Sequence, residues 1–476
     1  MKRKITYILS VLILLVIAGT FLCYVTGFLE LKSSKYNYSS FYEEEQNIDV
    51  LLLGSSHVKY GFFVEELWGE QGISAYNLAG DGSTIPVSYW VLVNALEYQE
   101  PKMVVMDVFD MWPGRKYSES WGHVHTQMDA IPFGSQKYRM VMDVFDDAML
   151  QNDGYSKNKK WELLWNFGEY HSRWNSITED FFTDYYSIVN ASRIWKGSQP
   201  LIGLVKRDKT EYLQDDVESL AYDYIAKEYI EKMIRLCDAN GIELLLINTG
   251  YDCSPQSKLF HDSVSKIAMD NNIKYIDFTH LDVINFDTDL YDSGHNTHVN
   301  YSGAMKLTYY LEKYISLNYK LPDHRNDERY AEWNEDYKKY VTSKQHYLTW
   351  QESFADYFML LYDNDYSVIV DIRDSSALED YILRKMLINL GVKVEGDANL
   401  FSCDVTSKAE AFINDYSNDL VWRTSTGICR YVNSDDGYSI LMNDVEVFSA
   451  LLKNEFRVNV IVLDKNTGEL INSKSF

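Results

Sequence analysis

The stretch IDVLLLGSSH, Ile48–His57, decides how the rest of the chain is interpreted. Its first six residues are mostly apolar, a run too short for a helix, and Gly54 ends it. Such a run is typical of a parallel strand that is buried on both faces. Ser55 and Ser56 then stand at the carboxyl end of this strand, where open α/β sheets place their ligands.

Strand and helix patterns alternate after this stretch. We expect further strands at 73–77, 102–108, 242–247 and 273–278, and helices at 61–71, 86–98, 220–239, 258–271 and 302–319. The alternation predicts a three-layer α/β fold, in which helices cover both faces of a parallel sheet. The stretch from about 110 to 215 is irregular and rich in Trp, Tyr, His and Asp, which indicates an insertion over one edge of the sheet.

The N-terminus carries a membrane signal. The basic residues Lys2–Lys4 precede an uncharged, mostly apolar run from Ile5 to Phe28, which is long enough to cross a bilayer as a helix. We expect 1–28 to be an uncleaved transmembrane signal anchor and 29–47 a polar linker; a cleaved signal peptide is the alternative. The basic flank predicts a single-pass protein of the cell membrane whose remaining chain is extracellular.

Composition excludes two classes of protein. The chain has 476 residues with 45 Lys and Arg against 70 Asp and Glu, so its formal net charge is −25. This charge argues against electrostatic binding of nucleic acid, which needs a basic face. Hydrophobic residues at 46% and aromatic residues at 15% are enough for a packed core, which excludes disorder as the main state.

The cysteines do not form a disulfide framework. Four of the five lie outside the apolar run: Cys237, Cys253, Cys403 and Cys429. Cys403 and Cys429 either pair or remain free buried thiols. The sequence has no Cys/His cluster with metal-ligand spacing, so we expect no metal and no cofactor.

The C-terminal part has its own pattern. A polar, charged stretch at 325–352 indicates a boundary between domains at 48–340 and 345–476. Beyond it we expect a helix at 377–390 and strands at 366–372, 438–442, 458–463 and 469–473, of which the last two form a hairpin. These elements predict a smaller C-terminal β-rich domain.

Three elements could supply nucleophilic chemistry. Ser56 would need a base to remove its proton and an acceptor to orient that base. The glycine-rich turn 77–84 follows the second strand, where the Gly82 backbone could bind an oxyanion. The segment 292–303 contains Asp292, His295 and His298 just before the last helix. Taken one by one, each element also fits a structural role as a helix cap, a turn or a buried histidine.

Together the three elements resemble the SGNH/GDSL hydrolase superfamily, over about residues 48–320. Gly54–Ser56 matches the first block of that superfamily, and His298–Gly303 matches the last. The second block is matched by Asn77, Gly82 and Thr84. The resemblance implies a flavodoxin-like parallel sheet and a serine nucleophile.

The resemblance also implies roles for residues, and two positions depart from the pattern. Ser56 would be the nucleophile and His298 the base, while Gly82 and the backbone at His57 would hold the oxyanion. The usual Asn after the third strand is absent from 107–110, and the usual Asp three residues before His298 is replaced by His295. Asp292 would therefore reach His298 across a longer turn, or His295 would be the base in an alternative register.

With its anchor, the chain looks like membrane-anchored SGNH-like proteins that act on cell-surface polymers. These include the D-alanyl transfer protein of teichoic acid and alginate O-acetylation proteins, which partner with membrane-bound O-acyltransferases. The likeness implies an extracytoplasmic serine esterase or O-acyltransferase that acts on acyl esters, such as acetyl esters, of a cell-surface glycan. In the insertion, His171 and Arg173 are candidates for binding substrate; a stacked surface arginine is the alternative for Arg173.

The C-terminal domain resembles the interleukin-like EMT inducer domain at 366–374 and 458–469. That domain is a lectin-like sandwich, so the resemblance implies contact with glycan. It also leaves an alternative function open, a non-catalytic glycan-binding scaffold that partners a membrane-bound O-acyltransferase.

Overall fold

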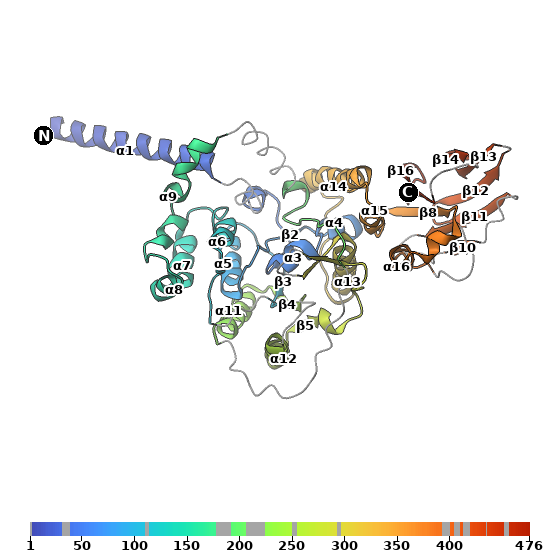
Figure 1. Ribbon diagram of the computed structural model, residues 1–476. Coiled ribbons are helices and arrows are strands. Elements are labelled where there is room, and N and C mark those ends of the chain that lie inside the picture. Colours follow the sequence, from blue (N-terminus) through green and yellow to red (C-terminus); the bar gives the residue numbers. More distant parts are fainter. Residues whose placement is uncertain are drawn as a thin grey trace.

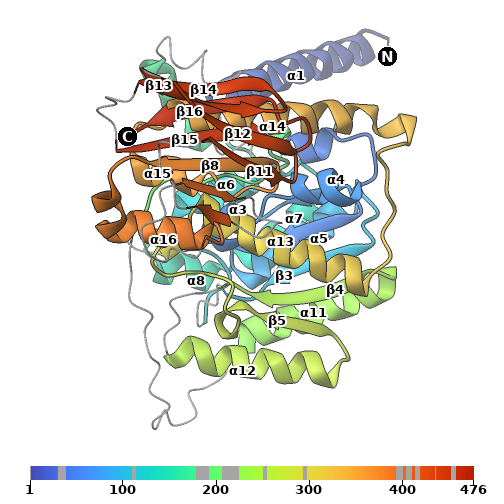
Figure 2. The same cartoon turned by 90° about the vertical axis from the view of Figure 1, so that its right-hand side faces the viewer.

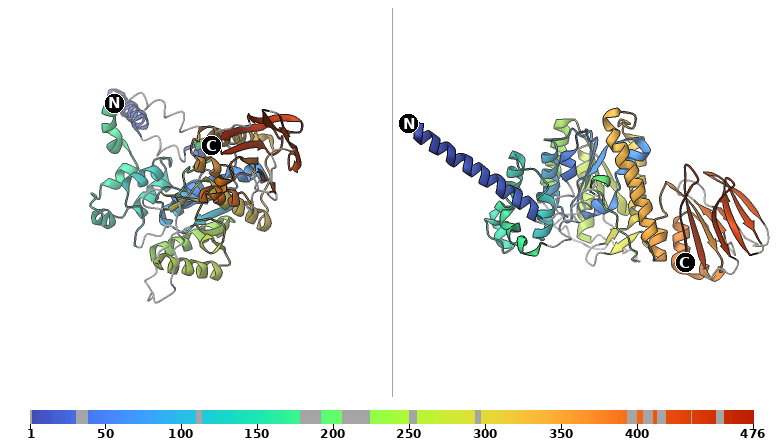
Figure 3. Two further views of the ribbon diagram at one scale, coloured as in Figure 1. Left: turned by 45° about the vertical axis from the view of Figure 1, so that its right-hand side comes forward. Right: turned by 90° about the horizontal axis from the view of Figure 1, so that it is seen from above.

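A computed structural model describes most of the chain, namely residues 2–30, 39–109, 114–177, 192–205, 224–249, 255–292, 297–392, 400–403, 410–412, 419–434, 436–451 and 457–476. The helix α1 (Lys2–Leu29) projects from one end of an α/β body, and the C-terminal strands lie at the other end (Figure 1). The view from above shows the same order along the molecule (Figure 3).

The helix α1 is long and apolar enough to cross a membrane, as an anchor or as a signal sequence. Most of its side chains are exposed, whereas Thr26, Leu29 and Glu30 at its end are buried. Only the last turns of α1 therefore pack against the rest of the protein.

The α/β body is built on a five-stranded parallel sheet, which confirms the expected fold class. Its strand order is β2-β1-β3-β4-β5. The strands are β1 (Val50–Leu53), β2 (Ala75–Asn77), β3 (Met103–Asp107), β4 (Glu243–Asn248) and β5 (Lys274–Asp277). In β1, Val50 and Leu52 join the core on one face, while Leu51 and Leu53 join the core on the other. This is why an unbroken apolar run, rather than an alternating one, marks the strand.

Helices cover both faces of this sheet. The core that contains Val50 receives side chains from α3 (Ser56–Gly61), α4 (Glu65–Gln71), α13 (Tyr301–Asn318) and α14 (Ala331–Trp350). The core that contains Leu51 receives side chains from α5 (Ile85–Ala95), α6 (Trp121–Met128), α7 (Ser135–Val144), α11 (Tyr224–Asn240) and α12 (Pro255–Asp270).

The described part of the insertion contains several short helices. Besides α6 and α7 it contains α8 (Asp147–Asn152), η1 (Lys159–Leu163), α9 (Phe167–Tyr170) and η2 (His171–Ser176). The helix α7 packs against α5, which covers a face of the sheet, and α9 and η2 contact the end of α1. The insertion thus lies between the sheet and the apolar helix.

The C-terminal part is a sandwich of two antiparallel sheets (Figure 2). One sheet has the order β10-β9-β8-β15-β16, with β8 (Tyr366–Ile372), β9 (Leu400–Cys403), β10 (Glu410–Phe412), β15 (Val458–Asp464) and β16 (Leu470–Ser475). The other sheet has β11 (Leu420–Thr424), β12 (Gly427–Asn433), β13 (Gly437–Met442) and β14 (Val445–Leu451). The helix α16 (Tyr381–Asn389) packs on the first sheet.

Two expectations for this part are settled. The strands β15 and β16 pair as the expected hairpin. Cys403 and Cys429 are free buried thiols, so they do not form a disulfide; Cys253 lies outside the described residues.

The charged stretch at 325–352 is mostly the helix α14, which joins the two parts. Lys344 on α14 is fully buried, and its Nζ lies 2.8 Å from Glu66 of α4 and 3.0 and 2.8 Å from Asp363 and Asp365 before β8. Part of the charge in this stretch therefore belongs to a buried ion-pair network. The remaining short elements are η3 (Phe278–His280), η4 (Glu328–Tyr330), α15 (Phe354–Met359) and η5 (Ser375–Glu379).

Candidate active site

Ser56 is presented by a sharp turn between β1 and α3. Gly54 has φ +150°, and a Cβ there would lie 2.8 Å from atoms of Asp107 and Val58, so only glycine fits. Ser55 then caps α3, because its Oγ accepts a hydrogen bond from the His57 backbone. Ser56 is the first residue of α3 and is buried.

His298 meets Ser56 from a second hairpin. The short strands β6 (Leu290–Asp292) and β7 (Thr297–Val299) pair so that His298 stands opposite Tyr291. The His298 Nε2 lies 2.8 Å from the Ser56 Oγ, a hydrogen-bond distance across 242 residues of sequence. Asn300 follows β7, and its Nδ2 donates at 2.9 Å to the carbonyl of Thr288, which precedes β6. This hydrogen bond links the two open ends of the hairpin.

The surroundings favour a neutral His298. Burial lowers the pKa of His298 below its usual value of 6.5, with opposing smaller effects from Asp81, which raises it, and Lys59, which lowers it. A neutral imidazole can accept the Ser56 proton at Nε2. The buried Nδ1 of His298 has no hydrogen-bond partner among the residues that the structure describes.

The structure describes only part of Asp292, the expected acidic partner, and none of His295, the alternative base. The backbone of Asp292 ends β6, one residue beyond the partner of His298, and its side chain is outside the described set. His295 also lies outside the described residues. The roles of Asp292 and His295 therefore stay predictions.

Gly82, the expected oxyanion donor, lies in a turn between β2 and α5. Gly82 has φ +62°, and within the described part of the chain its backbone N–H donates no hydrogen bond. A Cβ at Gly82 would lie 2.9 Å from the His123 Nδ1 and 3.0 Å from the Ser118 Oγ. Glycine is thus required both by the backbone conformation and by the insertion residues that close over the turn.

The role of the His57 backbone at an oxyanion stays a prediction, and the structure shows the following contacts of this residue. Its backbone N–H donates to the Ser55 Oγ at 3.4 Å, so the helix cap already engages it. Its ring packs on Phe109, with ring centroids 4.1 Å apart, and against His298 at 4.9 Å. His57 therefore packs beside the Ser56–His298 pair.

Three polar residues beside His298 escaped the sequence analysis. The Lys59 Nζ lies 2.9 Å from Asp81, and the Tyr60 hydroxyl donates to the same carboxylate at 2.9 Å. Although burial raises the pKa of Asp81, Lys59 and Tyr60 bring it below its usual value. The Tyr60 ring lies edge-on to His298 at 5.2 Å. Their only signal in the sequence is closeness to Ser56 and Gly82.

Other strands of the sheet also end in buried polar groups. Asp107, where the resemblance led us to look for an Asn, accepts hydrogen bonds from the backbone and hydroxyl of Thr249 at 3.2 and 2.9 Å. On the next strand the Asn248 Nδ2 lies 3.0 Å from both His261 and Asp277. Burial lowers the pKa of His261 to about 4, so this histidine is neutral.

His171 and Arg173 lie away from Ser56, and their role in binding substrate stays a prediction. Arg173 donates through Nη1 to the carbonyl of Leu29 at the end of α1. The last carbonyls of a helix lack partners within the helix, and the guanidinium supplies one. The His171 Nδ1 lies 2.8 Å from the Gly168 carbonyl. Both residues belong to η2, near the foot of α1, whereas α3 lies in the centre of the body (Figure 1).

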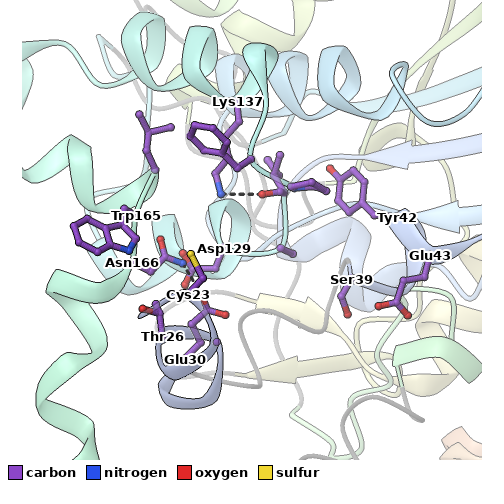
Figure 4. A pocket seen from close by; sticks show the side chains of 16 residues that line it. Cys23, Thr26, Glu30, Ser39, Tyr42, Glu43, Asp129, Lys137, Trp165 and Asn166 are labelled. Carbon is purple, nitrogen blue, oxygen red and sulfur yellow. Dashed lines mark hydrogen bonds between the residues drawn. The ribbon is translucent and has the colours of Figure 1, made fainter. Parts of the chain in front are cut away.

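A cavity of about 480 Å³ also lies at the foot of α1 rather than at Ser56 (Figure 4). Cys23 and Thr26 of α1 line it, together with Asp129, Lys137 and Asn166 of the insertion. None of its lining residues belongs to the Ser56–His298 site.

Comparisons with known proteins give fold-level similarity only. No protein-family model and no curated protein matches this chain. One similar solved structure is a Bacteroides fragilis protein provisionally described as an acylhydrolase, with 11% identity, a TM-score of 0.28, and coverage of 59% of this chain and 94% of that one. Another is a GDSL-like lipase from Bacteroides thetaiotaomicron, with 10% identity, a TM-score of 0.27, and coverage of 60% and 97%. Similarity at this level leaves the chemistry to be inferred from Ser56 and His298.

Proposed function

We propose that this chain is a serine esterase or O-acyltransferase that works outside the cytoplasm on acyl esters of a cell-surface glycan. The observation that carries the proposal is the 2.8 Å contact between the His298 Nε2 and the Ser56 Oγ at the carboxyl end of β1. A serine activated by a neutral histidine is the arrangement required for acyl transfer.

The geometry supports the following chemistry. Ser56 attacks the ester carbonyl while His298 takes its proton, and the Gly82 N–H binds the negative oxygen of the tetrahedral intermediate. His298 then gives the proton to the departing alcohol, which leaves the acyl group on Ser56. Water or a sugar hydroxyl then gives its proton to His298 and attacks the acyl carbon, and the bond to the Ser56 Oγ breaks as His298 returns the proton to this oxygen.

The imidazolium that forms on His298 needs an acceptor at Nδ1. This nitrogen is buried and has no partner among the described side chains, and Asp292 ends the strand next to it. We assign Asp292 the role of orienting His298 and stabilising its charged form. The contact with Ser56 favours His298 over His295 as the base.

The missing oxyanion donor predicts a slow hydrolase or an enzyme tuned for transfer. Asp107 occupies the strand end where an Asn donor is usual, and it is engaged with Thr249. Loss of one oxyanion donor typically costs about 2.7–4 kcal/mol of transition-state stabilisation. The apolar helix α1 would hold the enzyme at the membrane, beside a membrane-bound O-acyltransferase that supplies the acyl group.

The test uses the full chain in detergent. We would measure hydrolysis of p-nitrophenyl acetate, label the protein with a serine-reactive fluorophosphonate, and locate the label by mass spectrometry. Label on Ser56 that is lost in Ser56→Ala and kept in the control Ser316→Ala, at an exposed serine of α13, is the expected result. Folded protein with neither turnover nor label would favour the non-catalytic glycan-binding scaffold.

A further inference from the structure

A second group of reactive side chains lies in the insertion, away from Ser56. One ring nitrogen of His125 and one carboxylate oxygen each of Glu162 and Glu169 lie within 4.8 Å of one another. They come from α6, η1 and α9, three short elements that are separate in the sequence. These residues do not have the sequence spacing of a known metal-binding motif, so the sequence alone did not predict this site.

His125 is held as a metal-binding histidine is held. It is 2% exposed, and its Nδ1 lies 2.9 Å from the Asp129 Oδ1. The other oxygen of Asp129 accepts a hydrogen bond from the Tyr170 hydroxyl. A carboxylate at one ring nitrogen fixes the ring and leaves the other nitrogen for a metal.

The other nitrogen of His125 is the decisive observation. Its Nε2 is buried and has no hydrogen-bond partner among the described residues. An unsatisfied polar atom in a protein interior is rare and calls for an explanation, such as an ion that binds there. Since Nδ1 is engaged with Asp129, Nε2 is the ring nitrogen available beside the two glutamates.

We propose that His125, Glu162 and Glu169 bind a divalent transition metal, with Zn²⁺ as the best match. Zinc accepts imidazole nitrogen together with carboxylate oxygen, whereas Ca²⁺ and Mg²⁺ prefer oxygen ligands alone. Three protein ligands would leave room for water in a fourth position.

Lys159 competes with the metal for this place. Its Nζ lies 2.5 Å from Glu162 and 2.9 Å from Glu169, so its one positive charge is shared between the two carboxylates. It does not donate to the His125 Nε2, which a metal would bind. The Lys159 side chain is 24% exposed, so it can leave toward solvent when the metal enters.

The site would act as a clamp at the foot of α1. The helix α9 and the turn η2 contact the end of α1, where the Asn166 Nδ2 donates to Glu30 at 3.1 Å. Asp129, which holds His125, also lines the cavity at this end of α1 (Figure 4). A metal that joins α6, η1 and α9 would therefore stabilise the part of the insertion that meets the apolar helix.

The experiment titrates Zn²⁺ into the chelator-treated full chain in detergent, with bound metal counted by mass spectrometry and unfolding followed by heating. We expect one tightly bound Zn²⁺ and a higher Tm, and no comparable effect of Ca²⁺. Glu162→Gln with Glu169→Gln should abolish both effects, since these partly exposed side chains can be changed without disrupting the core. The exposed His346→Gln is the matched control and should bind as the unchanged protein does.

Two more variants test the details. Asp129→Asn should weaken Zn²⁺ binding by about 10–100-fold, as loss of an outer carboxylate does in other metal sites. Lys159→Met should strengthen it, because the competing ammonium is gone. The proposal is overturned if neither the unchanged chain nor Lys159→Met holds one Zn²⁺, or if the double glutamine variant binds it as well as the control.

Discussion

The two five-stranded sheets of this protein keep their buried polar side chains in different places. In the parallel sheet these groups stand at the carboxyl ends of strands, as Asp107 and Asn248 do. In the antiparallel sheet they stand within strands. Asp371 of β8 and Asn459 of β15 are fully buried opposite each other, and both lie within hydrogen-bond distance of the Tyr438 hydroxyl.

The difference follows from strand direction. All strands of a parallel sheet end at one edge, so the polar loops beyond them converge and can build a site. Antiparallel strands end at alternate edges, so a buried polar group must be paired locally or it destabilises the fold. Changes at the first sheet should therefore affect activity more than stability, and changes at the second should do the reverse.

The largest effect is expected at the edge of the parallel sheet. Ser56→Ala or His298→Ala should lower kcat/KM for an ester substrate by at least about 10³-fold, because nucleophile and base act as one unit. The double variant should lose little more than either single one. Thermal unfolding should change little for Ser56→Ala. Retained turnover in either single variant would show that the edge of the parallel sheet does not carry the activity.

The next effect is expected at Lys344, which joins the two regions. Lys344→Met leaves Glu66, Asp363 and Asp365 without their cation, and removal of one partner from a buried ion pair typically costs about 3–5 kcal/mol. Denaturant unfolding measures this loss. Lys338→Met on the same helix is the control, because its pair with Glu335 is exposed and worth about 1 kcal/mol or less. Equal losses of unfolding free energy in both variants would contradict a stabilising role for the buried ion pairs of Lys344.

A smaller effect is expected inside the sandwich. Tyr438→Phe removes the hydroxyl that lies 2.5 Å from the Asp371 carboxylate, and a hydrogen bond to a charged group is worth about 1.5–3 kcal/mol. The free energy of unfolding should fall by this amount while kcat/KM stays unchanged. A drop in kcat/KM for the folded variant would show that the sandwich takes part in catalysis.

The smallest effect concerns the pH dependence of the parallel-sheet site. His298 must be neutral to act as the base, and burial lowers its pKa, so kcat/KM should rise with pH through a midpoint below 6.5. Asp81 favours the protonated form of His298, so Asp81→Asn should move this midpoint lower still. Tyr438→Phe should leave it in place. A midpoint above 6.5 would mean that another group is being titrated.

Local sequence determined much of the fold. The apolar run before Gly54 predicts β1, and the strands at 366–372 and 458–463 appear within one residue of their expected ends. A strand that is buried on both faces is a short run of consecutive apolar residues. It can therefore be recognised from local sequence alone. Ser56 is a candidate on the same local evidence, because it follows the turn Gly54–Ser55 at the end of β1.

Only the tertiary structure decided which distant groups meet. The register of the hairpin between β6 and β7 turns His298 toward Ser56, and a slip of one residue would reverse its side. The contact of Arg173 with the end of α1 and the burial of Lys344 in a polar stretch are likewise visible only in the folded chain. His125 meets two glutamates that no motif connects to it. The spacing of residues along the chain determines local geometry. Contacts between distant residues depend on how whole helices and strands pack, which the sequence indicates only indirectly.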